Sequence, residues 1–290
     1  MSEIKLVIDE RHANIGRFTV GRLLPFRAKR LIGPFIYLDH MGPAFMSEEE
    51  NFDVLPHPHI GLSTLTYLLE GSIMHRDSLG SLKEIKPGEV NWMTAGKGIV
   101  HSERTPDLLR RESKKLHGIQ IWIALPKEFE QTEPSFTHIV ASEIPDWEVG
   151  DSRFKLIAGE VMGRKSPVPV FSRLYLLEIS SNKRRTLSFG DSFYGEYGIY
   201  IFEGSVQTGG RTYLKGKILV FENSPLHEIE LEENSRIFIL GGDPFPEERF
   251  ISWNFVSSDR ELIEQAKNDW RDQKFPAVPG ETEYVPLPGK

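Results

Sequence analysis

Four side chains of this sequence have the types and the spacing that transition-metal chemistry needs. His57 and His59 lie in the run Pro-His-Pro-His, and His101 and Glu103 lie in Ile-Val-His-Ser-Glu. On a β-strand, residues two apart point to the same face, so each pair presents its side chains together. Three imidazoles and one carboxylate can bind a single transition-metal ion. The sequence therefore predicts a metal site, provided that strand pairing brings the two pairs together.

Solvated loop histidines are the alternative interpretation, because the chain has nine histidines. Both pairs, however, lie within apolar, strand-like sequence, which favours the metal site. The ligand types alone do not choose among Fe(II), Mn(II), Co(II), Ni(II), Cu(II) and Zn(II). An octahedral ion with four protein ligands keeps two open positions, as an oxygenase needs, whereas a tetrahedral Zn(II) would be saturated and structural.

The composition excludes several kinds of protein. A net charge of −7 opposes direct binding to nucleic acid, which depends on clustered Lys and Arg. The absence of cysteine excludes disulfides and thiolate metal sites. The stretch Met1–Gly16 lacks the apolar segment of a signal peptide, and the longest apolar runs are too short to cross a bilayer. We therefore expect a cytoplasmic protein without membrane contact.

Alternation of apolar and polar residues indicates a protein built mainly of β-strands. Short strands separated by Gly, Pro, Asn and Asp favour barrels or sandwiches over alternating βαβ units. The expected strands are Phe35–Leu38, Ser63–Leu68, Gly118–Ile123, Arg173–Ile179, Ile199–Phe202, Ile218–Phe221 and Arg236–Leu240.

One helix is predicted near the C-terminus, from about Ser258 to Asp272. Ser258 and Glu261 have the spacing of a capping box. The apolar stripe that follows at helical spacing consists of Leu262, Ile263, Ala266 and Trp270. The proline-rich stretch Phe275–Lys290 is predicted to be extended, and it is either disordered or laid across the body.

An internal repeat indicates two similar β domains. The stretch Tyr67–Ile73 reads Tyr-Leu-Leu-Glu-Gly-Ser-Ile, and Tyr200–Val206 reads Tyr-Ile-Phe-Glu-Gly-Ser-Val. Both copies are typical of a strand that runs into a glycine-containing turn. We expect the link between the domains near Leu125–Asp151, where prolines and acidic residues collect.

The same repeat tests whether the second domain holds a metal. The offset between the copies is 133 residues, and it places Gly190 and Ser192 where the first copy has its first histidine pair. The glycine turns that follow place Ile229 and Leu231 where the first copy has the histidine and glutamate of its second pair. None of these residues is of a type that usually binds transition metals, and His227 nearby is alone. The second domain is therefore predicted to lack a metal site.

Several motifs of the N-terminal half resemble a known family. They are Pro56–Gly61, Glu70–Gly71, His75–Gly80, Pro87–Gly88 and Trp92–Glu103. Together these stretches resemble the pirin family of bicupins. The length, the two β domains, Gly241–Pro244 and the C-terminal helix are similar too, so the resemblance covers essentially the whole chain.

The resemblance implies an all-β bicupin, with two packed cupin-type β-barrels (double-stranded β-helix folds) and a C-terminal α-helix. The expected domains are residues 1–135, a cupin with the metal site; residues 136–256, a cupin without metal ligands; and residues 257–290, a helix and tail packed on the body.

The resemblance also implies one metal per chain, with Fe(II) as the usual ion. Its ligands are then His57, His59, His101 and Glu103. The general cupin pattern has a glutamate four or five residues after its second histidine, but Ser63 and Thr64 occupy those positions here. The departure favours the pirin branch, in which the later glutamate completes the site.

The activity that the resemblance implies is that of a quercetin 2,3-dioxygenase, with a flavonol and O₂ as substrates. In that hypothesis Glu103 is the general base that takes the proton of the flavonol 3-hydroxyl. The alternative is an iron-containing regulator that binds other proteins without catalytic turnover. His75 and Asp77 repeat the spacing of two, and we interpret them as part of a polar turn, with orientation of a ligand imidazole as the alternative.

Overall fold

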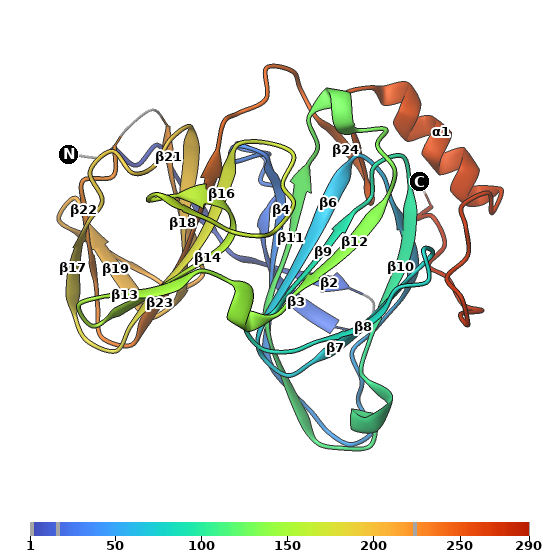
Figure 1. The fold of residues 1–290 in the computed structure, drawn as a ribbon, viewed down its shortest axis with the longest axis horizontal. Coiled ribbons are helices and arrows are strands. Elements are labelled where there is room, and N and C mark those ends of the chain that lie inside the picture. Colours follow the sequence, from blue (N-terminus) through green and yellow to red (C-terminus); the bar gives the residue numbers. More distant parts are fainter. Residues whose placement is uncertain (1–2, 16–17, 223–224, 290) are drawn as a thin grey trace. The chain divides into compact units, whose positions relative to one another are not determined.

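The computed structural model describes residues 3–15, 18–222 and 225–289. Strands dominate these residues, and a single α-helix, α1 (Arg260–Arg271), lies near the C-terminus (Figure 1). The strands expected from alternation are confirmed. The clearest two are contained in β6 (Leu62–Glu70) and β11 (Lys114–Ala124), which pair with each other in antiparallel register. Short 3₁₀ turns span Asp107–Leu109, Lys127–Phe129 and Ala141–Glu143.

The chain forms two compact units, each made of segments far apart in the sequence. Unit 1 comprises Met1–Arg11, Gly21–Tyr37 and Ser142–Phe245, and unit 2 comprises His12–Val20, Leu38–Ala141 and Pro246–Lys290. These units differ from the contiguous ranges 1–135, 136–256 and 257–290 expected from the sequence. The difference arises because β1 (Leu6–Asp9), from the N-terminal end, joins a sheet of unit 1, whereas Pro246–Lys290, from the C-terminal end, adds a separate hairpin and α1 to unit 2.

Unit 2 contains a four-stranded antiparallel sheet and most of a seven-stranded one. The larger sheet has the order β12 (Ser135–Ile139), β9 (Val90–Thr94), β6, β11, β4 (Phe35–Met46), β3 (Phe18–Leu24), β2 (Arg11–Ile15). The smaller sheet has the order β5 (Asp53–His59), β10 (Ile99–Arg104), β7 (Ile73–Asp77), β8 (Leu82–Ile85). A hairpin of β24 (Phe250–Ser252) and β25 (Phe255–Ser257) precedes α1.

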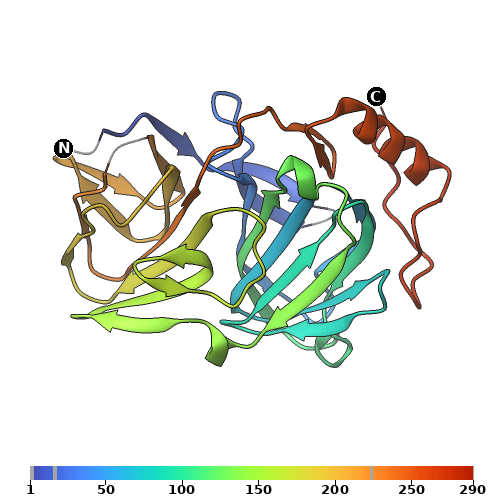
Figure 2. The same cartoon turned by 45° about the horizontal axis from the view of Figure 1, so that its top comes forward.

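Unit 1 repeats this plan with an eight-stranded and a four-stranded sheet. The larger sheet has the order β1 (Leu6–Asp9), β21 (Lys217–Glu222), β18 (Glu196–Glu203), β23 (Ser235–Gly242), β16 (Leu174–Ser181), β14 (Ser152–Val161), β13 (Asp146–Val149), with β15 (Arg164–Lys165) on β14. The smaller sheet has the order β17 (Arg185–Ser188), β22 (Glu228–Leu231), β19 (Ser205–Thr208), β20 (Arg211–Leu214). Figure 2 shows the dark blue β1 beside the orange strands of this unit.

The internal repeat in the sequence corresponds to a repeat in the structure. In one copy β6 runs through Gly71 into β7, and in the other β18 runs through Gly204 into β19. Both glycines have positive φ, 82° and 70°, a conformation that glycine adopts without a steric penalty. Each glycine turn therefore delivers a strand to the smaller sheet of its own unit.

Helix α1 begins one residue later than the capping box predicted. Asp259 is the N-cap, and its carboxylate accepts a hydrogen bond of 2.8 Å from the backbone N–H of Glu261. Ser258 does not cap the helix, because its backbone N–H and its hydroxyl both donate to Glu130. The contact with Glu130 thus prevents Ser258 from acting as the N-cap that local spacing had predicted.

The apolar face of α1 packs on unit 2. Ile263, Ala266 and Trp270 are buried together with Ile60, Val100, Phe255 and Val278. Leu262, which the sequence placed on the same face, is only half-buried. Burial of a large apolar side chain stabilises a fold by roughly 1.5–3 kcal/mol. The helix is therefore part of the core of unit 2.

The proline-rich tail lies along unit 2, as one of the two sequence-based alternatives predicted. Val278 is buried, and the indole N–H of Trp270 donates to the carbonyl of Val285 at 3.0 Å. The backbone N–H of Val285 in turn donates to the carbonyl of Pro56 at 2.8 Å, at the ligand-bearing strand β5. The tail is thus tied both to the helix and to the strand that carries the first histidine pair.

Candidate metal centre

Antiparallel pairing of β5 with β10 brings His57 and His59 next to His101. His101 lies directly opposite His57, and Ile99 lies opposite His59. The register of this pairing shifts between His101 and Glu103, at a bulge or irregularity. Two neighbouring strands of one sheet therefore join the first pair to the histidine of the second pair.

His57, His59 and His101 form a buried group that can hold a metal ion. Each offers one nitrogen, and these three atoms all lie within 4.8 Å of one another. The side chains are 8%, 1% and 1% exposed, respectively. Their rings lie 4.4–5.0 Å apart, measured between centroids. Three imidazoles concentrated in so small a buried volume are unfavourable as cations and suited to a shared metal.

Burial keeps these imidazoles in the neutral form that metal ligation requires. Burial lowers the pKa of His57 to about 4, and it holds the pKa of His59 and of His101 well below the usual value. The neighbouring histidines lower the pKa of His59 and of His101 further, because one positive charge disfavours the next. At neutral pH each ring therefore has a lone pair to offer a metal ion.

Hydrogen bonds decide which nitrogen of the first two rings carries that lone pair. The Nδ1–H of His57 donates to the carbonyl of Leu55 at 2.8 Å, and the Nδ1–H of His59 donates to the carbonyl of Asn254 at 3.3 Å. A carbonyl only accepts, so the proton lies on Nδ1 and Nε2 is left unprotonated. Backbone acceptors of this kind are the usual outer partners of metal-ligating histidines.

The surroundings of the His101 ring show whether a metal ion fits the site. Nε2 of His101 is buried and has no hydrogen-bond partner. A buried polar atom without a partner is costly, and a metal ion is one way to satisfy it. The residues present therefore fit a bound transition metal.

Glu103 lies two residues after His101 on β10 and is 6% exposed. Its carboxylate accepts a hydrogen bond of 3.1 Å from the hydroxyl of Thr66 and a further one from Gln120. Burial raises the pKa of Glu103 despite these bonds. The close group of ligand atoms contains the three histidines and not Glu103. Its roles as fourth ligand and as general base stay predictions.

Sequence reasoning missed the residues that orient the site. Asn254 contributes only its backbone carbonyl, which carries no side-chain signature. Thr66 and Gln120 lie on β6 and β11, and each is an ordinary polar residue of an alternating strand. Their contact with Glu103 could have been suspected only from the register that sets Thr66 opposite Gln120.

The corresponding strands of unit 1 carry apolar side chains. Leu187 on β17 pairs with Ile229 on β22, and Leu231 pairs with Val206 on β19, and all four are buried in one apolar cluster. Ile229 and Leu231 are the positions that the sequence matched to the second ligand pair. Gly190 and Ser192, matched to the first pair by a fixed offset, lie in the turn after β17 instead, so that part of the matching was wrong.

His227, the lone histidine near these strands, is exposed. In the described residues of unit 1, therefore, no group of histidines or carboxylates stands where unit 2 has its histidine group.

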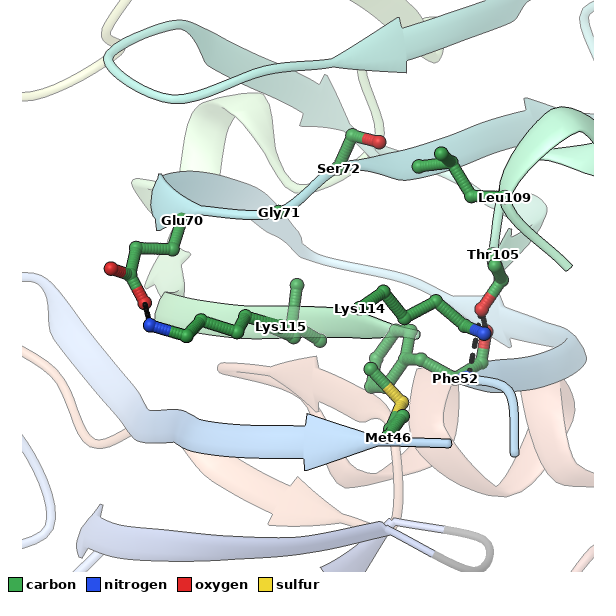
Figure 3. A pocket seen from close by; sticks show the side chains of 10 residues that line it. Met46, Phe52, Glu70, Gly71, Ser72, Thr105, Leu109, Lys114 and Lys115 are labelled. Atoms are coloured by element: carbon green, nitrogen blue, oxygen red, sulfur yellow. Dashed lines mark hydrogen bonds and ion pairs between the residues drawn. The ribbon is translucent and has the colours of Figure 1, made fainter. Parts of the chain in front are cut away.

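A small pocket lies elsewhere in unit 2 (Figure 3). Its volume is about 250 Å³, and its walls include the end of β4 at Met46, the turn at Gly71 and the start of β11. Lys115 and Glu70 form an ion pair of 3.8 Å along one side. None of its lining residues belongs to the histidine group, so the pocket and the candidate metal centre are separate features.

No helix in the described part of the chain has both the length and the apolar character needed to cross a membrane.

The fold and the buried histidines define a bicupin protein with a candidate metal centre in one of its units. Two family models match the chain: Pirin over residues 17–123, and the Pirin C-terminal cupin domain over residues 176–276. A Pirin-like protein of Caulobacter vibrioides is 48% identical over an alignment of 290 positions, which covers 98% of this chain and 99% of the relative. The chain therefore belongs to the pirin family, as its motifs indicated.

Solved structures agree with this assignment. The crystal structure of a quercetin 2,3-dioxygenase from Acinetobacter baumannii has a TM-score of 0.89 and 33% identity, covering 98% of this chain and 95% of that one. A bacterial pirin, YhhW of Escherichia coli, in complex with nickel(II), has a TM-score of 0.65 and 21% identity, covering 82% and 99%. At that identity the second likeness shows the fold alone. The all-β bicupin prediction is confirmed.

Proposed function

We propose that this chain is a metal-dependent dioxygenase that cleaves flavonols, with the activity of a quercetin 2,3-dioxygenase. The observation that carries the proposal is the buried group of three neutral imidazoles. In two of them Nδ1 is hydrogen-bonded to a backbone carbonyl. The name of the A. baumannii relative supports the same reaction class. Fold alone would not suffice, since one fold hosts many functions.

His57, His59 and His101 would hold the metal, with Glu103 as the fourth ligand. We propose Fe(II) as the ion in the working enzyme, although the donor set also suits Mn(II), Co(II), Ni(II), Cu(II) and Zn(II). When bound, the metal supplies Lewis acidity toward an oxygen of the substrate and redox chemistry toward O₂. The protein contributes the fixed orientation of three rings and the exclusion of water from a buried site.

Glu103 is proposed as the group that takes the proton of the flavonol 3-hydroxyl. A general base works best when its pKa lies near the working pH, and burial moves the pKa of Glu103 upward in that direction. The hydroxyl of Thr66 holds one carboxylate oxygen in place. Deprotonation makes the flavonol ring electron-rich, and addition of O₂ followed by ring cleavage releases carbon monoxide and leaves an ester.

Oxygen consumption tests the proposal directly. Protein stripped with a chelator and reloaded anaerobically with Fe(II) is mixed with quercetin and O₂, and both oxygen uptake and carbon monoxide release are followed. We expect equal amounts of the two, and neither with the stripped protein. A metal-loaded protein that consumes no oxygen across a panel of flavonols would contradict the proposal and favour the regulatory alternative, in which the metal protein binds other proteins.

A further inference from the structure

Two buried residues of β7 lie directly beside His101. The Nε2 atom of His75 is 3.0 Å from a carboxylate oxygen of Asp77, and its Nδ1 atom is 3.5 Å from Nδ1 of His101. His75 and Asp77 are 3% and 0% exposed. The pairing of β7 with β10 sets Asp77 opposite His101 and His75 opposite Glu103. The three side chains Asp77, His75 and His101 thus form a continuous chain of contacts.

The outer end of this chain is fixed by the backbone. The Oδ1 atom of Asp77 accepts from the N–H of Leu79 at 2.9 Å and from the N–H of Ser81 at 3.0 Å. The other oxygen, Oδ2, is thereby turned toward His75. The ring of His75 also stacks on Phe136, with centroids 4.3 Å apart and planes 11° apart. Neither Asp77 nor His75 can turn away without breaking several contacts.

The donors and acceptors along the chain have one consistent order. A carboxylate only accepts, so Nε2 of His75 carries the proton that Asp77 receives. With His75 in its neutral form, the lone pair lies on Nδ1, which is placed to accept the Nδ1–H of His101. With its proton on Nδ1, His101 has its lone pair on Nε2, the atom that has no hydrogen-bond partner.

We propose that Asp77 and His75 are positioning residues of the metal site, which fix the tautomer of His101 so that its Nε2 is ready to bind the ion. This inference rests on the proposed metal site and adds a role to two residues that lie outside the group of three histidines. His57 and His59 obtain the same tautomer from backbone carbonyls, whereas His101 obtains it from a side-chain pair. The third ligand is therefore the one whose tautomer a conservative substitution can reverse.

Asp77→Asn is the substitution that should reverse the tautomer of His101. The two backbone N–H groups of Leu79 and Ser81 require an oxygen at the Oδ1 position, so the new amide nitrogen must take the position that faces His75. An amide nitrogen donates, so Nε2 of His75 must accept and its proton moves to Nδ1. Nδ1 of His101 must then accept in turn, and its proton moves to Nε2, where it opposes metal binding.

Nickel(II) is the probe for the first measurement, because it does not oxidise in air. Its dissociation constant is measured by competition with a chelator, for wild type and for Asp77→Asn. We expect the substitution to weaken binding by about 10- to 100-fold, the usual effect of changing an outer partner of a metal-ligating histidine. Leu79→Ala is the matched control: its side chain is 49% exposed, and its backbone N–H still reaches Asp77. Nickel affinity within twofold of wild type in Asp77→Asn overturns the proposal.

The second measurement does not involve the metal. Nitrogen-15 chemical shifts of the His101 ring, recorded on stripped protein, distinguish a protonated from an unprotonated Nε2. We expect Nδ1–H in wild type and Nε2–H in Asp77→Asn, with His57 unchanged in both. A purely structural effect of the substitution leaves the tautomer as it was, and the same tautomer in both proteins overturns the proposal even if affinity falls.

His75→Phe completes the test, since it keeps a ring that can stack on Phe136 but removes the acceptor. If Asp77 acts only through His75, the protein with both Asp77→Asn and His75→Phe binds nickel(II) no more weakly than the protein with His75→Phe alone. If the two substitutions weaken nickel(II) binding additively, Asp77 does not act through His75 and the proposal is overturned. Wild-type protein that binds no nickel(II) contradicts the proposed function itself, and the tautomer measurement still decides whether the contact chain operates.

Discussion

Arg104 donates two hydrogen bonds to the carboxylate of Glu281, at 2.9 and 2.5 Å. Arg104 follows Glu103 on β10, whereas Glu281 belongs to the proline-rich tail. The hydroxyl of Ser102 donates to the same carboxylate at 2.8 Å. Since side chains alternate along a strand, these contacts lie on the opposite side of β10 from His101 and Glu103. The tail therefore supports the predicted ligand strand from behind.

We predict that Glu281→Gln destabilises the protein in a pH-dependent way. Burial favours a raised pKa for Glu281, but the hydrogen bonds from Arg104 and Ser102 outweigh it and hold the pKa below the usual value of 4.5. The ionised form therefore stabilises the fold at all pH values above about 4.5, and this contribution is lost as the pH falls through the lowered value. At pH 7 the loss in unfolding free energy is roughly 1–2 kcal/mol.

Denaturant titrations of both proteins at several pH values measure this difference. Glu283→Gln is the matched control, because Glu283 also faces Arg104 but is 62% exposed, and its removal costs less than about 0.5 kcal/mol. A gap between wild type and Glu281→Gln that stays constant from pH 7 to pH 3 would show that the charge of Glu281 does not matter.

We predict one tightly bound transition metal per chain in wild type and essentially none in His59→Ala. His59 contributes one of the three nitrogens of the buried group, and two imidazoles hold an ion far more weakly than three. The fold stays largely intact, because each unit has its own apolar core. Elemental analysis after metal-replete expression gives the stoichiometry, with His227→Ala, at an exposed histidine of unit 1, as the control. Two metals per wild-type chain, or one in His59→Ala, contradicts the prediction.

Glu103→Gln separates a general base from a mere ligand. The amide keeps the size of the side chain and can still accept from Thr66, but it is a very weak base. We predict that flavonol oxidation falls by about 10²–10⁴-fold per bound metal, the usual contribution of general base catalysis. Oxygen uptake must be normalised to the metal content of each preparation, since the variant also binds metal more weakly. Unchanged activity per bound metal removes Glu103 as the base.

Ile263→Ala tests the packing of α1. The side chain is 4% exposed and lies in the cluster with Ile60 and Val100. Removing a buried isoleucine side chain costs about 2–5 kcal/mol, so the unfolding transition shifts markedly to lower denaturant or temperature. Asn268→Ala, on the exposed face of the same helix, changes stability by no more than about 0.5 kcal/mol. Equal effects of the two substitutions would argue against the packed helix.

The local features of this fold could be predicted from the sequence because they depend on periodicity. A period of two marked β6 and β11, and the same period placed His57 with His59 on one face. The repeat at Gly71 and Gly204 revealed the shared plan of the units. Each of these signals is visible in short stretches of sequence, so no knowledge of which residues meet in the fold was needed.

The features that escaped prediction all involve partners far apart in the sequence. The acceptor for His59 is the backbone carbonyl of Asn254, 195 residues away, and any residue type could supply it. Ser258 failed as a helix cap because Glu130, which no local pattern connects to it, accepts its hydrogen bonds instead. Similarly, β1 joins the sheet of unit 1 beside β21, and only the pairing of these two distant strands shows its place.

The carbonyl that orients His59 belongs to Asn254, far along the chain, and this separation has a consequence for how the protein is made. A ribosome delivers the chain from its N-terminus, so β5 and β10 can pair long before Asn254 and the segment Pro246–Lys290 emerge. During that interval the nascent chain already contains all four predicted ligands, but His59 lacks the acceptor that orients it. The carbonyl that orients His59 is therefore supplied only after residue 254 has been synthesised.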